Sequence, residues 1–316
     1  MVKGGNGLLA PADGASDLIS MVPGLESLAD FDYRSVANID STNMHPGIWK
    51  KLAQTIYEEY DKFDGFVVTH GTDTMAYTAS ALSFALQNLS KPIVLTGAQK
   101  PIFDLASDGQ NNLANAVKVA LLDVPEVCIV FGTKILRGNR AQKKSKANLN
   151  AFWSPVALPL GCIAIEPEVA FERVIRSQDK NLKFTPDFEN EVMFYQIFPG
   201  LNAKYIEAAL DRGCKGIILN SYGAGNVPNA EFSLIPVIKK AVAANIPVVV
   251  ATQCVEGSAR LMYEVGYAAM EAGVISALDM TSEAAATKLM WSLSQTQNLQ
   301  EIKTLIDTNL SGEISI

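Results

Sequence analysis

The chain has 316 residues, 48% of them apolar and 19% charged, with a net charge of −7 and an isoelectric point near 5.0. This composition excludes a disordered protein, because disorder requires low hydrophobicity together with high net charge. The acidic balance argues against a nucleic-acid partner, since binding to phosphates depends on clustered Lys and Arg. The length fits two domains better than one.

The cysteines and the N-terminal residues indicate in which cellular compartment the protein is expected. The four cysteines form no Cys-x-x-Cys pair, so we expect no metal site of the zinc type. The first residues, MVKGGNGLLAPADG, lack the apolar core of a signal peptide, and no apolar run approaches the ~18 residues of a membrane helix. We therefore expect a cytoplasmic protein with reduced thiols and no membrane partner.

In the first half of the chain, short β-branched runs alternate with amphipathic segments. The spacing predicts a helix over 107–122 that begins at Ser107 or Asp108, residues that often cap helices. The other elements expected here are strands over 64–70, 91–97 and 126–132, and a helix over 74–89.

A second alternating set follows a charged, weakly periodic stretch. We expect its strands over 192–198, 215–225 and 246–254, its helices over 202–213 and 232–245, and one or two helices over 282–310.

Strands that alternate with helices are typical of α/β proteins, whose parallel sheets are covered on both faces. We predict a larger N-terminal doubly wound, flavodoxin-like domain over 1–168, a linker over 169–190, and a smaller C-terminal α/β domain with a parallel sheet over 191–316. Ligands of such sheets bind beyond the C-terminal ends of the strands. That rule singles out the loops THGTDT, TGAQKP, SYGAGN and TQC.

The loop THGTDT places Thr72 and Asp73 at the start of a predicted helix. One of them could simply cap the helix, but a cap needs one side chain and this loop supplies four polar ones. A carboxylate and free N–H groups together can hold a small zwitterion. We interpret His70 as a structural residue that fixes the loop through backbone hydrogen bonds, rather than as a general base. His45 is expected at the surface.

Other sequence motifs give weaker evidence for a catalytic or cofactor site. Lys143 follows a predicted strand and could act as a base in a cleft, but its spacing alone favours a solvated side chain. A serine hydrolase is poorly supported because no G-x-S-x-G elbow is present. The chain also lacks G-x-G-x-x-G and a P-loop, so we expect no nucleotide cofactor.

Five segments together carry a family resemblance: NIDSTNM, DGFVVTHGTDTMAYTASALSF, KPIVLTGAQKPI, RGNRAQK and SYGAGN. They resemble the bacterial-type L-asparaginase family, and most closely its cytoplasmic type I branch. The likeness covers nearly the whole chain in order and ends with LSGEISI. It implies hydrolysis of L-asparagine to L-aspartate and ammonia without metal or cofactor. It also implies a homodimer or homotetramer whose sites lie between the N-terminal domain of one subunit and the C-terminal domain of its neighbour.

The resemblance also assigns roles to residues. Thr72 matches the second catalytic threonine of the family, which forms a triad with Asp73 and Lys143. Ala98 matches the position whose backbone carbonyl faces the side-chain amide, and Asn226 lies in the region that approaches the neighbour's site. The stretch that binds the substrate carboxylate and amino group is matched by Asp40, Ser41 and Thr42.

The N-terminus departs from the family pattern. The family opens with a strand ending in T-G-G-T-I, whose last threonine is the usual nucleophile, and a lid follows it. Here MVKGGNGLLAPADG resembles the lid, and T-G-G-T does not occur in the 316 residues. We therefore expect that the first strand and its nucleophile are absent from this sequence. Two alternatives to an asparaginase stay open: a catalytically impaired protein that binds asparagine or aspartate, and the asparaginase-like subunit of a tRNA-dependent amidotransferase, which would carry an additional N-terminal domain.

Overall fold

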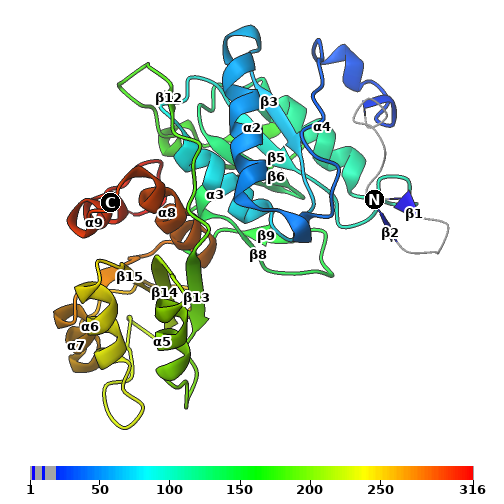
Figure 1. The fold of residues 1–316 in the computed structure, drawn as a ribbon. Coiled ribbons are helices and arrows are strands. Elements are labelled where there is room, and N and C mark those ends of the chain that lie inside the picture. The colour runs from blue at the N-terminus through cyan, green and yellow to red at the C-terminus, as the bar shows by residue number, and fades with distance from the viewer. Residues whose placement is uncertain (1, 4–8, 11–18, 316) are drawn as a thin grey trace. The chain divides into compact units, whose positions relative to one another are not determined.

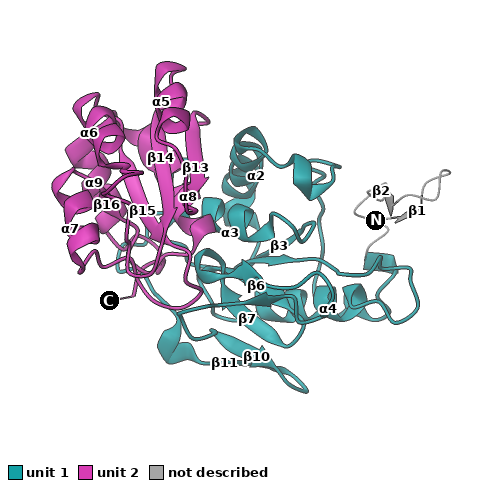
Figure 2. Cartoon of the chain, turned by 90° about the horizontal axis from the view of Figure 1, so that it is seen from below, with its two compact units in different colours: residues 1–186 teal, residues 187–316 magenta. Residues whose placement is uncertain are grey.

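The computed structural model describes residues 2–3, 9–10 and 19–315, and it forms two compact units, Met1–Pro186 and Asp187–Ile316 (Figure 2). The predicted domain limits at 168 and 191 stay a prediction. The segment expected to match the family's lid lies outside the described residues, apart from the paired strands β1 (Val2–Lys3) and β2 (Leu9–Ala10).

The first unit contains a six-stranded sheet in the order β11-β10-β7-β6-β5-β3. Figure 1 labels three of these strands, β3, β5 and β6. Its parallel strands are β3 (Phe66–Thr69), β5 (Ile93–Thr96) and β6 (Val127–Phe131), which confirms the three strands predicted there. The strands that pair antiparallel are β7 (Lys134–Arg137), β10 (Gly161–Ile163) and β11 (Pro167–Val169). The sheet is therefore mixed, where the sequence predicted a parallel one.

The connection between β6 and β7 explains this difference. Phe131 pairs with Lys134, so only Gly132 and Thr133 join the two strands. A two-residue connection can only make an antiparallel hairpin, because a parallel pair needs a crossover of a dozen or more residues. Gly132 supplies the positive φ of 58° that this turn requires.

Helices α3 (Met75–Ala85) and α4 (Gly109–Ala120) cover opposite faces of the sheet. Val94 of β5 packs with α4, and its neighbours Ile93 and Leu95 therefore point to the other face, because side chains alternate along a strand. All three are fully buried. Helix α3 is almost entirely buried, as expected for a core helix, and its buried polar side chains are Thr78, Ser80 and Ser83.

Helix α3 ends four residues earlier than predicted. After Ala85 the chain extends as β4 (Leu86–Gln87) and pairs with β12 (Lys183–Phe184), and Asn88 has a positive φ of 62°. Part of the predicted linker is thus paired within the first unit. Sequence reasoning did not identify helix α2 (Pro46–Glu59), whose buried stripe of Trp49, Leu52, Ala53 and Ile56 has helical spacing.

The second unit contains four parallel strands in the order β13 (Val192–Gln196), β14 (Gly216–Ser221), β15 (Val248–Thr252) and β16 (Ile275–Ser276), which confirms the predicted parallel sheet. Ile217 packs toward one face and Ile218 toward the other, as strand alternation requires. The first face is covered by α5 (Lys204–Asp211), α6 (Ile235–Ala243) and α7 (Glu264–Glu271). The second is covered by α8 (Ser282–Gln295) and α9 (Leu299–Asp307).

A buried ion pair holds the C-terminal segment against α8. Lys288 Nζ lies 2.6 Å from Glu313 Oε1, and both side chains are 0% exposed. The ammonium also donates to the carbonyl oxygens of Ile306 (2.8 Å) and Thr308 (2.6 Å). Burial lowers the pKa of Lys288, while the Glu313 carboxylate acts in the opposite direction. The network is satisfied only while both charges are present.

We predict that Lys288→Met destabilises the second unit by about 3–5 kcal/mol, because the substitution leaves the Glu313 carboxylate buried without its partner. Urea unfolding followed by circular dichroism measures this loss as a lower transition midpoint. Lys303→Met, an exposed position on α9, is the matched control and should unfold like the unsubstituted chain. Equal midpoints for both variants would contradict the prediction.

Candidate active site

The loop that joins β3 to α3 carries the predicted catalytic pair. Thr74 is the N-cap residue of α3, but its side chain makes no capping bond and instead donates to the carbonyl oxygen of Ser41 at 2.8 Å. Neither Thr72 nor Asp73 is the helix cap, so the simple capping interpretation of these two residues is wrong. Both side chains are available next to the positive end of a helix.

Lys143 brings the loop into contact with a distant part of the sequence. Its Nζ donates to Thr72 Oγ1 at 2.6 Å and to Asp73 Oδ1 at 2.7 Å. It is held there by β8 (Gln142–Lys143), which pairs with β9 (Phe152–Trp153). The Lys143 side chain is only 17% exposed, whereas that of Asp73 is 59% exposed. The interpretation of Lys143 as a solvated lysine is therefore wrong.

Gln99 is a further residue that contacts Thr72, and the sequence analysis did not single it out. Thr72 Oγ1 donates to Gln99 Oε1 at a long 3.4 Å, and Gln99 Nε2 donates to the carbonyl oxygens of Ser145 (3.0 Å) and Asn148 (3.2 Å). Gln99 thus connects the Thr72 loop to the segment that follows Lys143. Its position in TGAQKP, just beyond a parallel strand, was the signal that could have identified it.

The loop of Ala98 is held by a buried carboxylate. Asp108 is 7% exposed and accepts from the backbone N–H groups of Gln99 (3.0 Å) and Lys100 (3.1 Å). Asn112 adds a hydrogen bond to the carbonyl oxygen of Gly97 at 2.9 Å. Asp108 is the N-cap residue of α4 as predicted, yet its carboxylate caps no backbone N–H of the helix. Besides the neighbouring loop, it accepts from the Asn112 side chain of α4 at 3.0 Å. Ala98 is therefore on a loop fixed on both sides.

The segment Asp40–Thr42 lies against the Thr72 loop through Ser41. Ser41 is 6% exposed, and a Cβ added at Gly71 would lie 2.6 Å from Ser41 Oγ. The Asp40 carboxylate accepts from Thr42 N at 2.9 Å and from Thr42 Oγ1 at 2.8 Å. These hydrogen bonds, the backbone one first, lower the pKa of Asp40. The structure therefore brings Ser41 against Gly71 and Thr74 of the Thr72 loop, while the Asp40 carboxylate is bonded to Thr42.

His70 and Asn226 have different surroundings. His70 Nδ1 lies 2.6 Å from the carbonyl oxygen of Gly71, which confirms the expected backbone contact. Burial lowers the pKa of His70, and the bond to Gly71 acts in the opposite direction. Asn226 lies in the second unit, in a turn where its N–H donates to Tyr222 O at 2.8 Å. Its Oδ1 is buried and has no partner among the described residues.

Comparison with known families covers most of the chain. The family described as "Asparaginase, N-terminal" matches residues 1–175, and "Glutaminase/Asparaginase C-terminal domain" matches residues 191–306. The chain belongs to the asparaginase family. The family match therefore agrees with the resemblance carried by HGTDTM and TGAQ.

Individual relatives within the asparaginase family support this assignment. An L-asparaginase of Thermococcus kodakarensis is 39% identical over 92% of this chain and 88% of its own length. A structure of the thermostable L-asparaginase of that organism superimposes with a TM-score of 0.90 at 37% identity, covering 99% of this chain and 95% of the other. A glutamyl-tRNA(Gln) amidotransferase polypeptide of Pyrococcus abyssi is 36% identical over 98% of this chain, which spans 72% of that protein.

A structure of a probable cytoplasmic L-asparaginase from Campylobacter jejuni is also similar. Its TM-score is 0.83 at 30% identity, covering 94% of each chain. Among the described residues of this asparaginase family member, no helix is long and apolar enough to cross a membrane. The same residues include no group of three or more His, Cys, Asp or Glu side chains that could hold a metal ion.

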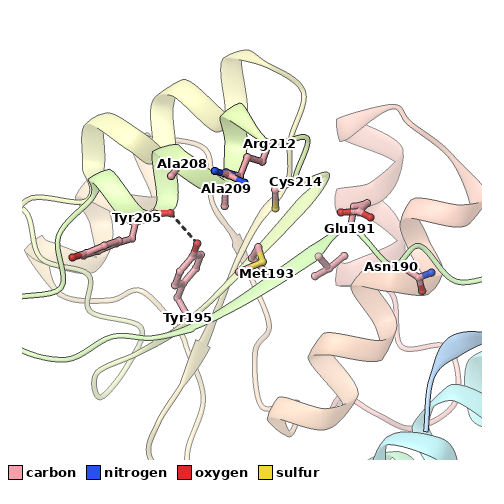
Figure 3. Close-up of a pocket in the computed structure, with 10 residues that line it drawn as sticks. Asn190, Glu191, Met193, Tyr195, Tyr205, Ala208, Ala209, Arg212 and Cys214 are labelled. Atoms are coloured by element: carbon pink, nitrogen blue, oxygen red, sulfur yellow. Dashed lines mark hydrogen bonds between the residues drawn. The ribbon is translucent and has the colours of Figure 1, made fainter. Parts of the chain in front are cut away.

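A surface pocket of about 340 Å³ lies in the second unit, between strand β13 and helix α5 (Figure 3). Its lining includes Met193, Cys214 and Arg212, and the Tyr195 hydroxyl donates to the carbonyl oxygen of Tyr205 at 3.1 Å. None of the site residues predicted for this asparaginase family member lines the pocket. The pocket therefore has no part in the candidate active site.

We predict that His70 titrates below the ordinary histidine value of about 6.5, because burial disfavours its charged form. The unfolded chain then binds the proton more readily, so the free energy of unfolding should fall as the pH drops from about 6.5 through the folded pKa. NMR titration of the imidazole resonances measures this directly, and His45→Gln assigns them because the chain has only 2 histidines. A pKa of His70 at or above 6.5 would refute the prediction.

Proposed function

We propose that this protein is an L-asparagine amidohydrolase that converts L-asparagine to L-aspartate and ammonia. The observation that carries the proposal is the position of Lys143 Nζ, 2.6 Å from Thr72 Oγ1 and 2.7 Å from Asp73 Oδ1. A hydroxyl, an amine and a carboxylate in mutual contact can move a proton to and from a reacting amide. Membership of the asparaginase family and the similar L-asparaginases support the same reaction.

Substrate binding follows from the charges around the loop. The half-exposed Asp73 carboxylate keeps one oxygen free of Lys143 and can accept the substrate ammonium. The N-terminus of α3 favours the substrate α-carboxylate, with Ser41 beside it. The Ala98 carbonyl accepts a hydrogen bond from the side-chain amide. Asp40 and Thr42 complete this binding segment.

Proton transfer is assigned to the triad. As the attacking hydroxyl forms its C–O bond to the amide carbon, its proton passes to Thr72 Oγ1, and the original Thr72 Oγ1 proton passes to Lys143 Nζ, which takes part in this step as the neutral amine. When the C–N bond breaks, the same proton passes to the departing nitrogen and ammonia leaves. Water then hydrolyses the acyl intermediate to L-aspartate. Asp73 stabilises the Lys143 ammonium that forms between these steps.

The two candidate functions differ in whether the protein supplies the oxygen that attacks the amide carbon. The resemblance assigns the attack to the threonine of T-G-G-T-I, and that string does not occur in the 316 residues. The second candidate is therefore a catalytically impaired protein that binds asparagine or aspartate through the same side chains. Loss of a nucleophile typically costs several powers of ten in rate.

We also propose that the protein is cytoplasmic and self-associates as a homodimer or homotetramer. In such an assembly Asn226 approaches the site of a neighbouring subunit. Its buried Oδ1, which has no partner among the described residues, supports a role in binding. The similar probable cytoplasmic L-asparaginase of Campylobacter jejuni supports the location.

We predict that Lys143→Met lowers the rate of ammonia release from L-asparagine by about 10²–10⁴-fold, the usual contribution of a positioned proton-transfer group. Release is measured with a coupled ammonia assay on the 316-residue chain. Lys146→Met changes an exposed lysine three residues along and should leave the rate unchanged. An unchanged rate of ammonia release in Lys143→Met would refute the triad.

The same assay distinguishes the candidates. Saturable ammonia release by the unsubstituted chain excludes the impaired binding protein. No release, together with calorimetric binding of L-aspartate, would instead favour that candidate and contradict the amidohydrolase.

A further inference from the structure

Three side chains from different elements form a hydrogen-bonded chain that ends at the Thr72 loop. Trp49 Nε1 of α2 lies 3.0 Å from Thr78 Oγ1 of α3, and Thr78 Oγ1 lies 2.9 Å from His70 Nε2. On the other side of the ring, His70 Nδ1 lies 2.6 Å from the carbonyl oxygen of Gly71. Trp49 is 6% exposed and Thr78 0% exposed, so water does not compete for their bond.

The two ends of this chain dictate the directions of its first and last hydrogen bonds. An indole nitrogen only donates, and a carbonyl oxygen only accepts. Trp49 therefore donates to Thr78 Oγ1, and His70 Nδ1–H donates to Gly71. In a neutral imidazole Nε2 then carries no proton, so Thr78 Oγ1 donates to His70 Nε2. A neutral imidazole with its proton on Nδ1 satisfies all these groups at once. Free histidine in water prefers the other tautomer, so the protein imposes this one.

The carbonyl at the end of the chain belongs to the peptide that joins Gly71 to Thr72. Because a trans peptide is planar, the direction of this carbonyl also fixes the direction of the Thr72 N–H. The segment has no room to move toward Ser41, since a Cβ at Gly71 would lie 2.6 Å from Ser41 Oγ. The backbone that presents the Thr72 hydroxyl to Lys143 is therefore constrained from two sides.

We propose that Trp49, Thr78 and His70 form a positioning relay that fixes the Gly71–Thr72 peptide and so orients the Thr72 hydroxyl toward Lys143. The relay acts through the backbone, so its members are positioning residues. The inference rests on the proposed hydrolytic site for its consequence, but the tautomer it requires does not depend on any substrate. Burial of His70 favours the same neutral form.

The first test measures the tautomer. Long-range ¹⁵N–¹H NMR at pH 8 reports which imidazole nitrogen carries the proton, and His45→Gln identifies the signals of the 2 histidines. The unsubstituted chain should show His70 protonated on Nδ1. Thr78→Val should remove the donor to His70 Nε2 and so move the ¹⁵N resonance of Nε2 and the Thr72 amide resonance, and Thr78→Ser should restore both. A predominant Nε2–H form in the unsubstituted chain overturns the relay, whatever the activity.

The second test measures the consequence for the reaction. Thr78→Val should lower kcat for ammonia release by about ten-fold or more with little change in KM, the effect expected when one ordinary hydrogen bond no longer aligns a reacting group. Thr78→Ser should recover most of the rate. Thr287→Val is the matched control, because Thr287 is also a helical threonine at 0% exposure and its hydroxyl donates to the Glu283 carbonyl at 2.9 Å.

The outcomes separate the relay from the proposed function. An unchanged kcat in Thr78→Val, no recovery in Thr78→Ser, or an equal loss in Thr287→Val overturns the positioning role. If the unsubstituted chain binds L-aspartate without turnover, the Kd for L-aspartate should change little in Thr78→Val, and the Thr72 amide shift of Thr78→Val against Thr78→Ser decides the relay. If it neither hydrolyses nor binds, the proposed function fails, and the Thr72 amide shift of Thr78→Val against Thr78→Ser still decides the relay.

Discussion

The contact of the Lys143 ammonium with Thr72 and Asp73 is the interaction on which the rest of the site depends. A charge that is mostly removed from water needs a partner, and Asp73 supplies it at 2.7 Å. The partnership holds Lys143 Nζ at 2.6 Å from the Thr72 hydroxyl, a distance at which a proton can be exchanged. Without the carboxylate, the lysine would gain more from solvent than from the threonine.

The surrounding side chains hold these three groups in place. Gln99 and Asp108 connect the neighbouring loops through backbone groups, so two strand ends and the segment after Lys143 form one hydrogen-bonded unit. His70 fixes the loop from the other side. Loops at strand ends are otherwise the mobile part of α/β folds, and these bonds limit their freedom. The positions of the reacting groups are thus set mainly by backbone hydrogen bonds.

The sequence predicted the elements better than their pairing. The alternation of strands and helices identified β3, β5 and β6 because each is a short β-branched run between turn residues. It missed the antiparallel hairpin at Gly132, since a two-residue turn is a weaker signal than a periodic run. For the site, the resemblance selected Thr72, Asp73 and Lys143, which the structure places in contact. Spacing alone misjudged Lys143 as solvated, because no local pattern reveals a contact between residues 71 positions apart.

The most direct test of amino-acid binding at the Thr72 loop is the affinity of the chain for L-aspartate, measured by isothermal titration calorimetry. Asp73→Asn keeps the shape of the side chain but removes the charge that is proposed to bind the ligand ammonium. We predict a Kd at least about ten-fold weaker, which corresponds to ~1.4 kcal/mol of a charge-assisted hydrogen bond. An unchanged Kd in a folded Asp73→Asn protein would mean that this loop does not bind an amino acid.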